Sequence, residues 1–180
     1  AEPGSGLQLA WARSFAGTAL TDEQLDYVAA LLDGSETLTG LTIDTEMRWT
    51  LLLALVTAGR ADLPEIEAEL TRDKTATGER YALQARAARP TAEAKAEAWA
   101  SVVDQDTLAN HTVAAVVGGF QSVPVDKREE LLTPYTAKYF AALEEVWNSR
   151  THEIATLIAT GLYPTFLIEQ ATLDATERFL

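Results

Sequence analysis

The stretch Asp44-Thr45-Glu46-Met47-Arg48-Trp49, followed by the apolar block Leu51–Val56 and by Gly59, decides the fold class of this chain. It predicts one helix that is capped by Asp44, is apolar nearly all round and ends at Gly59 in a left-handed cap. A helix without a broad polar face lies inside a helical stack and not on its surface. The stretch therefore predicts a protein built from stacked helices.

Two pairs of residues on predicted apolar faces are candidates for a site. Arg48 and Trp49 are adjacent near the helix start, and Asp44, one turn earlier, is the nearest partner for an otherwise costly buried charge. Lys95 lies one turn before Trp99, where its stem is expected to lie along the indole ring. Either these residues form structural locks, or they face a cavity and receive an anionic group such as a peptide carboxylate.

Helix signals recur along the rest of the chain, whereas only Leu38–Ile43 is compatible with a short extended segment. Thr21-Asp22-Glu23-Gln24 is a capping box, and Asp62, Thr91 and Thr151 each mark a further helix start. The predicted helices cover residues 21–33, 44–58, 62–70, 78–88, 91–103, 108–120, 126–147, 151–160 and 165–180.

Short loops between these segments favour an all-α fold of antiparallel helical hairpins, in an α-solenoid-like array related to HEAT and armadillo proteins. We expect one helical-array domain over residues 7–180. Ala1–Gly6 reads as a linker or a cloning remnant. Because Met47 is the only methionine, the chain is expected to be a fragment of a longer protein.

Composition narrows the possible partners. Fourteen basic and 27 acidic residues give a net charge of −13, which disfavours nucleic acid and anionic membranes as partners. The chain has no cysteine and therefore no disulfide. Its longest apolar block, Leu51–Val56, is far too short to span a bilayer, and no signal peptide is visible. We expect a cytoplasmic protein.

Catalytic signals are scarce. His152 and Glu153 begin like the zinc motif H-E-x-x-H, but Thr156 stands where the second histidine would be. His111 lies away from the valine stripe of its predicted helix. The acidic groups, including Glu65, Glu67 and Glu69, read as solvated helix faces. No catalytic and no metal-ligating residue is predicted within the chain.

Taken together, several motifs resemble the C-terminal helical domain of M1-family zinc aminopeptidases, the aminopeptidase N group. The resemblance covers about Leu7 to Leu180, and the alanine-rich character is similar to actinobacterial members. The motifs are Asp44-x-x-Met47-Arg48-Trp49 with its apolar block and Gly59, Pro90–Trp99, Tyr139-Phe140, Trp147, Arg150, and Gly161-Leu162-Tyr163-Pro164.

The resemblance implies a parent enzyme that binds one zinc ion through H-E-x-x-H and a downstream glutamate, and that removes N-terminal residues from peptides. A G-x-M-E-N motif would hold the substrate amine. None of these motifs stands in this chain, so they would lie in an upstream catalytic domain, which would be its partner. The chain itself is expected to cap the active site, to line the substrate chamber and to be inactive alone. The alternative is a free-standing helical-repeat scaffold that binds proteins on its concave face.

Overall fold

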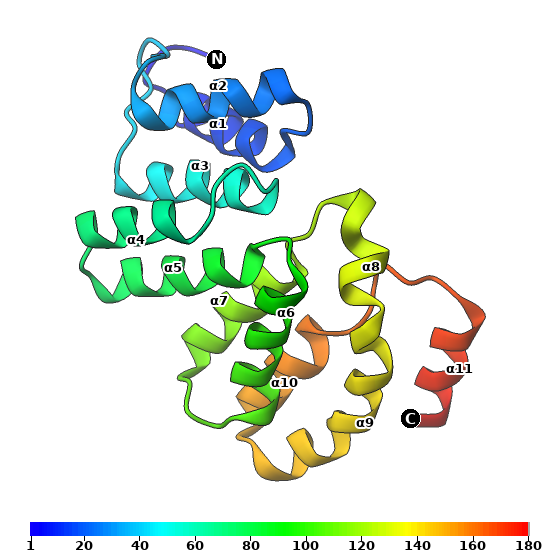
Figure 1. The fold of residues 1–180 in the computed structure, drawn as a ribbon. Coiled ribbons are helices and arrows are strands. Elements are labelled where there is room, and N and C mark those ends of the chain that lie inside the picture. Colours follow the sequence, from blue (N-terminus) through cyan, green and yellow to red (C-terminus); the bar gives the residue numbers. More distant parts are fainter. Residues whose placement is uncertain (180) are drawn as a thin grey trace.

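The computed structural model describes residues 1–179, and within that range it contains helices and no strand (Figure 1). This confirms the predicted all-α class. The N-terminal half contains α1 (Gly6–Thr18), α2 (Asp22–Asp33), α3 (Thr45–Thr57), α4 (Leu63–Arg72) and α5 (Ala76–Ala88). The C-terminal half contains α6 (Ala92–Trp99), the π-helical turn η1 (Ala100–Asp104), α7 (Asn110–Gln121), the 3-10 turn η2 (Val125–Lys127), α8 (Arg128–Leu132), α9 (Pro134–Ser149), α10 (His152–Gly161) and α11 (Gln170–Phe179).

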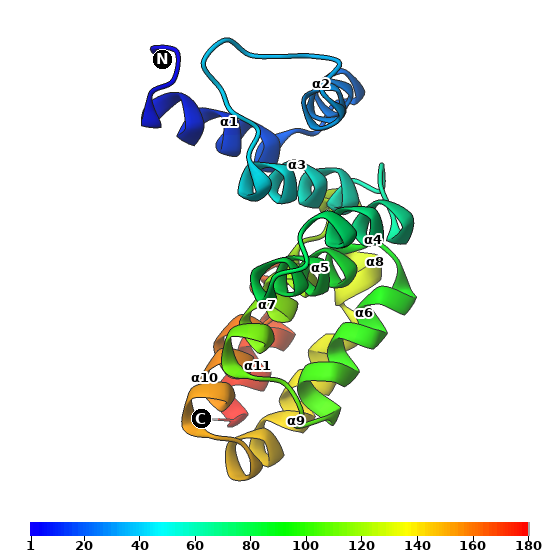
Figure 2. The same ribbon diagram turned by 90° about the vertical axis from the view of Figure 1, so that its left-hand side faces the viewer.

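The helices stack into an elongated, curved array whose two termini lie at opposite ends (Figures 1 and 2). Helices α1 and α2 pack on α3, α3 packs on α5, α5 on α7, and α7 on α10. Helix α9 then packs on α10, and α11 lies on α9. Each helix therefore contacts mainly its neighbours along the stack, as in helical-repeat proteins.

Five of the predicted helix starts are confirmed by side-chain caps. In each case a side-chain oxygen accepts a hydrogen bond from an amide in the first turn, which satisfies a group that the helix itself leaves unpaired. The capping residues are Thr21, Asp44, Asp62, Thr91 and Thr151. Gly34 follows α2 with a φ of 85°, the left-handed position that the sequence predicts.

Both ends of the chain differ from the prediction. The first helix, α1, is absent from the predicted set because its apolar residues do not fall on one face. Ser5 caps it, and Gln8 joins the amide of Gly4 at 2.7 Å to the carbonyl of Thr39 at 2.8 Å. The presumed linker therefore contacts the fold. The last helix begins at Gln170 and not near Thr165, because the backbone of residues 162–169, around Pro164, forms bends and turns.

Three clusters of buried apolar side chains follow one another along the array. The first joins α1, α2 and α3, the second joins α3, α4 and α5, and the third extends from α5 to α10. Because α3 and α5 each contribute to two clusters, they connect the stack. Core side chains include Val28, Leu31, Met47 and Leu51 in the first, Trp49, Leu52, Val56 and Ile66 in the second, and Trp99, Val116, Phe120, Leu132 and Ile158 in the third.

Helices α5 and α7 make the most extensive contact between helices, and Gly119 allows it. A Cβ atom at position 119 would lie 2.1 Å from the carbonyl oxygen of Gln84 and 2.9 Å from the Cβ of Ala87. The neighbouring Gly118 has room for a side chain, because a Cβ atom there would lie 3.7 Å from the Gln84 side-chain nitrogen. Gly118 and Gly119 are both helical glycines, but only Gly119 lies against the backbone of α5. Substituting each in turn therefore distinguishes the effect of the close helix contact from the general cost of glycine in a helix.

We expect Gly119→Ala to lower the free energy of unfolding by about 1–3 kcal/mol, because backbone atoms of α5 must move away. Gly118→Ala is expected to raise it by up to about 1 kcal/mol, because alanine is the better helix former. Urea unfolding followed by circular dichroism measures both. Equal effects of the two substitutions would contradict the close contact between α5 and α7.

Candidate functional site

The polar side chains that the array buries are the candidates for a site, because burying a polar group is costly unless it is paired. Within residues 1–179, these are Gln8, Glu69, Asp73, Lys95 and Thr172. Lys95 belongs to the predicted site. Glu69 and Asp73 turn out to be the partners of the predicted Arg48 and Trp49.

Arg48 lies on α3 and forms a two-point ion pair with Glu69 on α4, not with Asp44. Its Nε donates to Glu69 Oε1 and its Nη2 to Glu69 Oε2, both at 2.7 Å. Its Nη1 donates to the carbonyl of Leu32 at the end of α2 at 3.0 Å. The hydrogen bonds with Glu69 raise the pKa of Arg48 above its usual value. Arg48 therefore joins three helices.

The predicted ion pair between Asp44 and Arg48 is wrong. The Asp44 carboxylate accepts a hydrogen bond from the Met47 amide at 2.8 Å, so it serves as the cap of α3. Glu69 is also not solvated, since only 4% of it is exposed. The sequence contains a signal for the burial of Glu69. Ile66, Glu69 and Asp73 recur at helical spacing, so they lie on the side of α4 that packs on the stack.

Trp49 makes a second polar contact across the same helices. Its indole Nε1 donates to Asp73 Oδ2 at 2.9 Å, and the Thr75 hydroxyl donates to Asp73 Oδ1 at 2.7 Å. The hydrogen bonds from Thr75 and Trp49 lower the pKa of Asp73. Thr75 in turn caps α5. Arg48 and Trp49, adjacent in sequence, thus connect α3 to α2, to α4 and to the start of α5.

Lys95 on α6 is completely buried and its ammonium contacts backbone carbonyls. Its Nζ donates to the carbonyl oxygens of Ala87 at 2.6 Å, Gly119 at 3.2 Å and Ser122 at 3.4 Å. These oxygens belong to the C-terminal ends of α5 and α7, where the helix dipole favours a positive charge. Burial nevertheless lowers the pKa of Lys95 to about 7.

The aromatic ring next to the Lys95 ammonium is that of Phe120, whereas the sequence-based prediction concerned the lysine stem and Trp99. Lys95 Nζ lies 5.8 Å from the centre of the Phe120 ring, within the range of a cation–π contact. Trp99 contacts other rings, with its centre 6.2 Å from that of Phe120 and 5.1 Å from that of Tyr135. Trp99 thus belongs to the apolar core of the C-terminal half.

Four of the five predicted residues form two separate polar centres, and the fifth, Trp99, lies in the apolar core. Asp44, Arg48 and Trp49 lie at the junction of α2 to α5, and Lys95 lies where α5, α6 and α7 meet. In both centres the cationic donors are bonded to groups of the chain itself. Because the donors of Arg48 and Lys95 are directed at acceptors of the protein, these two centres hold helices together.

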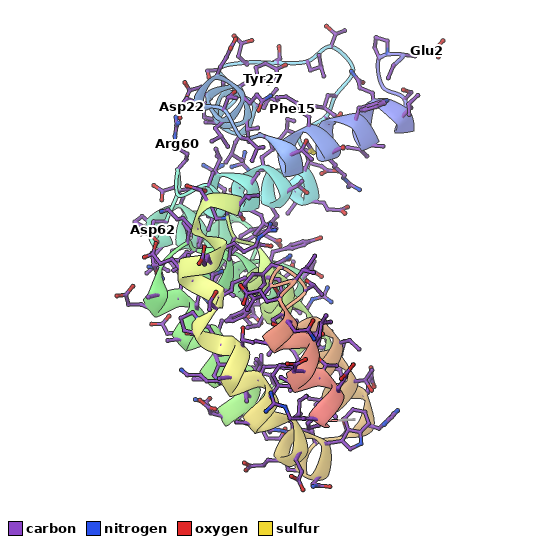
Figure 3. All side chains as sticks on the ribbon, turned by 90° about the vertical axis from the view of Figure 1, so that its right-hand side faces the viewer. Glu2, Phe15, Asp22, Tyr27, Arg60 and Asp62 are labelled. Atoms are coloured by element: carbon purple, nitrogen blue, oxygen red, sulfur yellow. The ribbon has the colours of Figure 1, made fainter. Side chains whose placement is uncertain are left out.

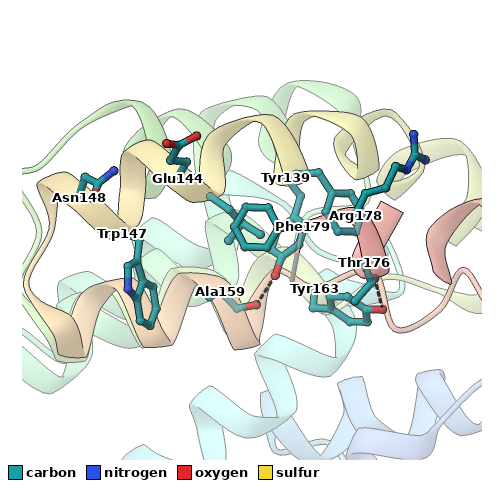
Figure 4. A pocket seen from close by; sticks show the side chains of 11 residues that line it. Tyr139, Glu144, Trp147, Asn148, Ala159, Tyr163, Thr176, Arg178 and Phe179 are labelled. Carbon is teal, nitrogen blue, oxygen red and sulfur yellow. Dashed lines mark hydrogen bonds between the residues drawn. The ribbon is translucent and has the colours of Figure 1, made fainter. Parts of the chain in front are cut away.

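A cavity of about 700 Å³ lies elsewhere, between α9, α10 and α11 (Figure 4). Its described lining includes none of the five predicted residues. Tyr139 donates to the carbonyl of Ala159 at 2.6 Å, and the hydroxyls of Tyr163 and Thr176 lie 3.0 Å apart. Burial, together with Tyr163, raises the pKa of Tyr139 to about 12. Five aromatic residues contribute to the cavity lining: Tyr139, Phe140, Trp147, Tyr163 and Phe179.

The described residues do not supply a metal site. Residues 1–179 contain no cluster of three or more His, Cys, Asp or Glu side chains placed to hold an ion. The ring of His152 lies edge-on to Trp147, with ring centres 5.5 Å apart. In the same range, no helix combines the length and the apolar character that crossing a membrane requires.

Comparison with known proteins gives two findings. A profile of the ERAP1-like C-terminal domain family matches residues 2–180. The chain is also 57% identical, over all 180 of its residues, to a protein named aminopeptidase N from Streptomyces lividans. It spans 21% of the length of that relative.

Proposed function

Since the chain belongs to the ERAP1-like C-terminal domain family, we propose that it serves as the C-terminal domain of a zinc aminopeptidase that removes N-terminal residues from peptides. The observation that carries the proposal is the match to aminopeptidase N, which covers the whole chain but only 21% of the relative. The remaining length is ample for a separate catalytic domain.

The zinc ion belongs, in this proposal, to the upstream part of the parent. Zinc sites in hydrolases use three protein ligands and an open position, and the described residues do not place such a set together. No step of peptide-bond cleavage is therefore assigned to side chains of this chain. Its contribution is geometric: it closes over the active site, restricts entry and lines the substrate chamber.

The five predicted site residues are proposed to act as structural locks. Arg48 directs its donors at Glu69 and Leu32, and Lys95 directs its ammonium at carbonyl oxygens. Binding a peptide carboxylate at either cation would require breaking these contacts. Firm connections between successive helices suit a domain that acts as a wall, because a chamber of fixed size requires neighbouring helices that do not slide.

The experiment compares the full-length parent with a parent that ends before Ala1. Both are assayed with an aminoacyl p-nitroanilide and with a long unstructured polypeptide. We expect removal of this domain to raise activity on the polypeptide, relative to the small substrate, by about tenfold, equivalent to about 1.4 kcal/mol of discrimination. Zinc content and circular dichroism verify that the truncated parent is folded.

Two controls complete the design. The purified 180-residue chain, given zinc and the p-nitroanilide, should release no more product than a boiled sample. Added to the truncated parent, it should restore size discrimination. Turnover by the isolated chain would contradict its non-catalytic role, and an unchanged substrate ratio in a folded truncated parent would contradict the chamber role.

A further inference from the structure

Helix α1 exposes a stripe without any charged residue. The stripe, called the α1 face below, consists of Leu7, Ala10, Trp11, Ser14, Gly17 and Thr18. Leu7 is 60% exposed and Trp11 is 64% exposed. Arg13 is the single charged residue of α1, and it points to Glu46 on α3 at 3.1 Å.

The neighbouring helix shows the opposite pattern. Its exposed residues are acidic: Asp22, Glu23, Asp26 and Asp33. With a net charge of −13, this chain has ample charge for solvent-facing surfaces, so an uncharged stripe at one end of the array stands out. Terminal helices of stacked repeats require a polar outer face to remain soluble. The α1 face instead resembles a surface between two helices of an array.

An apolar hollow adjoins the α1 face. It measures about 320 Å³, and its lining includes Trp11 and the N-terminal residue Ala1. Phe15 and Tyr27, whose ring centres are 5.9 Å apart, lie together at this end of the array (Figure 3). The remaining lining residues are Gln8, Ala12, Leu31, Leu38 and Leu41.

We infer that the α1 face is covered, in the longer protein, by the segment that immediately precedes Ala1, folded as a further helix of the same array. The relative is about five times as long as this chain, since the chain spans 21% of it, and the matched family is a C-terminal domain, so a preceding segment is expected. Ala1 lines the hollow, so that segment enters the fold beside the α1 face. Array helices stack on like neighbours, which favours a helix over a surface of the catalytic domain.

The α1 face and the hollow constrain which residues the covering helix can present to them. Its contact face is uncharged, because a charge buried against Leu7 and Trp11 would have no partner. It carries at least one large apolar side chain that enters the hollow beside Trp11. The inference rests on the proposed function only in that this chain is part of a longer protein.

The test is photo-crosslinking in the full-length protein. Trp11→p-benzoylphenylalanine is irradiated, and the crosslinked peptide is identified by mass spectrometry. We expect a crosslink within about 50 residues before Ala1, the length of one helical repeat. Glu23→p-benzoylphenylalanine, on the acidic face of α2, is the matched control and should give no crosslink to that segment.

Other outcomes overturn the inference: a crosslink to the domain that carries the H-E-x-x-H motif, a crosslink to a second copy, or no crosslink at position 11. A second measurement is independent of crosslinking. Trp11→Glu should lower the melting temperature of the full-length protein and leave that of the isolated 180-residue chain unchanged. Equal shifts in both proteins would contradict a covering helix. Aminopeptidase activity, assayed on the same samples, tests the proposed function separately.

Discussion

Arg48→Met is expected to lower the free energy of unfolding of this chain by about 3–5 kcal/mol. The substitution leaves the Glu69 carboxylate, only 4% exposed, without the two hydrogen bonds that compensate its burial. Arg72, at 3.9 Å from Glu69, is too distant and too solvated to replace them. The carbonyl of Leu32 also loses its donor. Urea unfolding of the 180-residue chain at neutral pH measures the loss.

Helix α4 supplies a matched control. Arg86 pairs with Glu67 at 2.5 Å, but Glu67 lies on the exposed side of α4 with 53% of its side chain accessible. Arg86→Met is therefore expected to cost less than about 1 kcal/mol. The double substitution Arg48→Met with Glu69→Met should recover most of the loss, because a buried ion pair is often replaceable by apolar side chains. Similar costs for Arg48→Met and Arg86→Met would contradict the lock at α3 and α4.

The helices were largely predictable because their signals are local. Thr21, Asp44, Asp62, Thr91 and Thr151 act within one turn of their own helix, so a cap can be recognised without knowing what the helix contacts. Helix α1 also has a side-chain cap, Ser5, but it lacks an apolar stripe on one face. Its apolar residues point both to the core and to the α1 face, so no single stripe marks it.

Partners of charged residues were not predictable in the same way. Local spacing favours Asp44 for Arg48, yet the carboxylate that binds it is 21 residues away on α4. The Asp44 carboxylate already caps α3, so local spacing assigned two roles to one group, the helix cap and the partner of Arg48. Only the stacking of α3 on α4 brings Glu69 and Asp73 to Arg48 and Trp49.

The partners of Lys95 were not predictable from the sequence either. Helical spacing correctly places it on the buried face of α6, but its acceptors are backbone oxygens of α5 and α7. Every residue has a carbonyl group, so no residue type marks these acceptors in the sequence. Their convergence depends on where α5 and α7 end and on the close contact at Gly119.

Lys95 should make the stability of the chain depend on pH in an uncommon direction. Its pKa in the folded state is about 7, whereas a lysine in the unfolded chain titrates at about 10.4. Between these values the unfolded chain binds a proton that the folded chain does not. The free energy of unfolding therefore rises with pH, by up to about 1.4 kcal/mol per pH unit between pH 7 and pH 10. Below pH 7 both states are protonated and this contribution is constant.

Comparison with Lys95→Met isolates the effect. Other titrating groups contribute equally to both proteins, so the difference between their free energies of unfolding reports on Lys95. We expect this difference to increase steadily in favour of the unsubstituted chain from about pH 7 to about pH 10. Tyr139, whose pKa burial raises to about 12, stays protonated throughout that range.

The matched control is Lys138→Met, which removes an exposed lysine on α9 whose Nζ lies 4.8 Å from the centre of the Tyr135 ring. Its difference curve serves as the baseline, because Lys138 stays in contact with water when the chain folds. A Lys95→Met curve that does not rise above this baseline would contradict the prediction. It would mean that the carbonyls of Ala87, Gly119 and Ser122, with the dipoles of α5 and α7, keep the ammonium charged despite its burial. The pH profile therefore measures which effect dominates at this junction, the loss of hydration or the oxygen atoms that replace it.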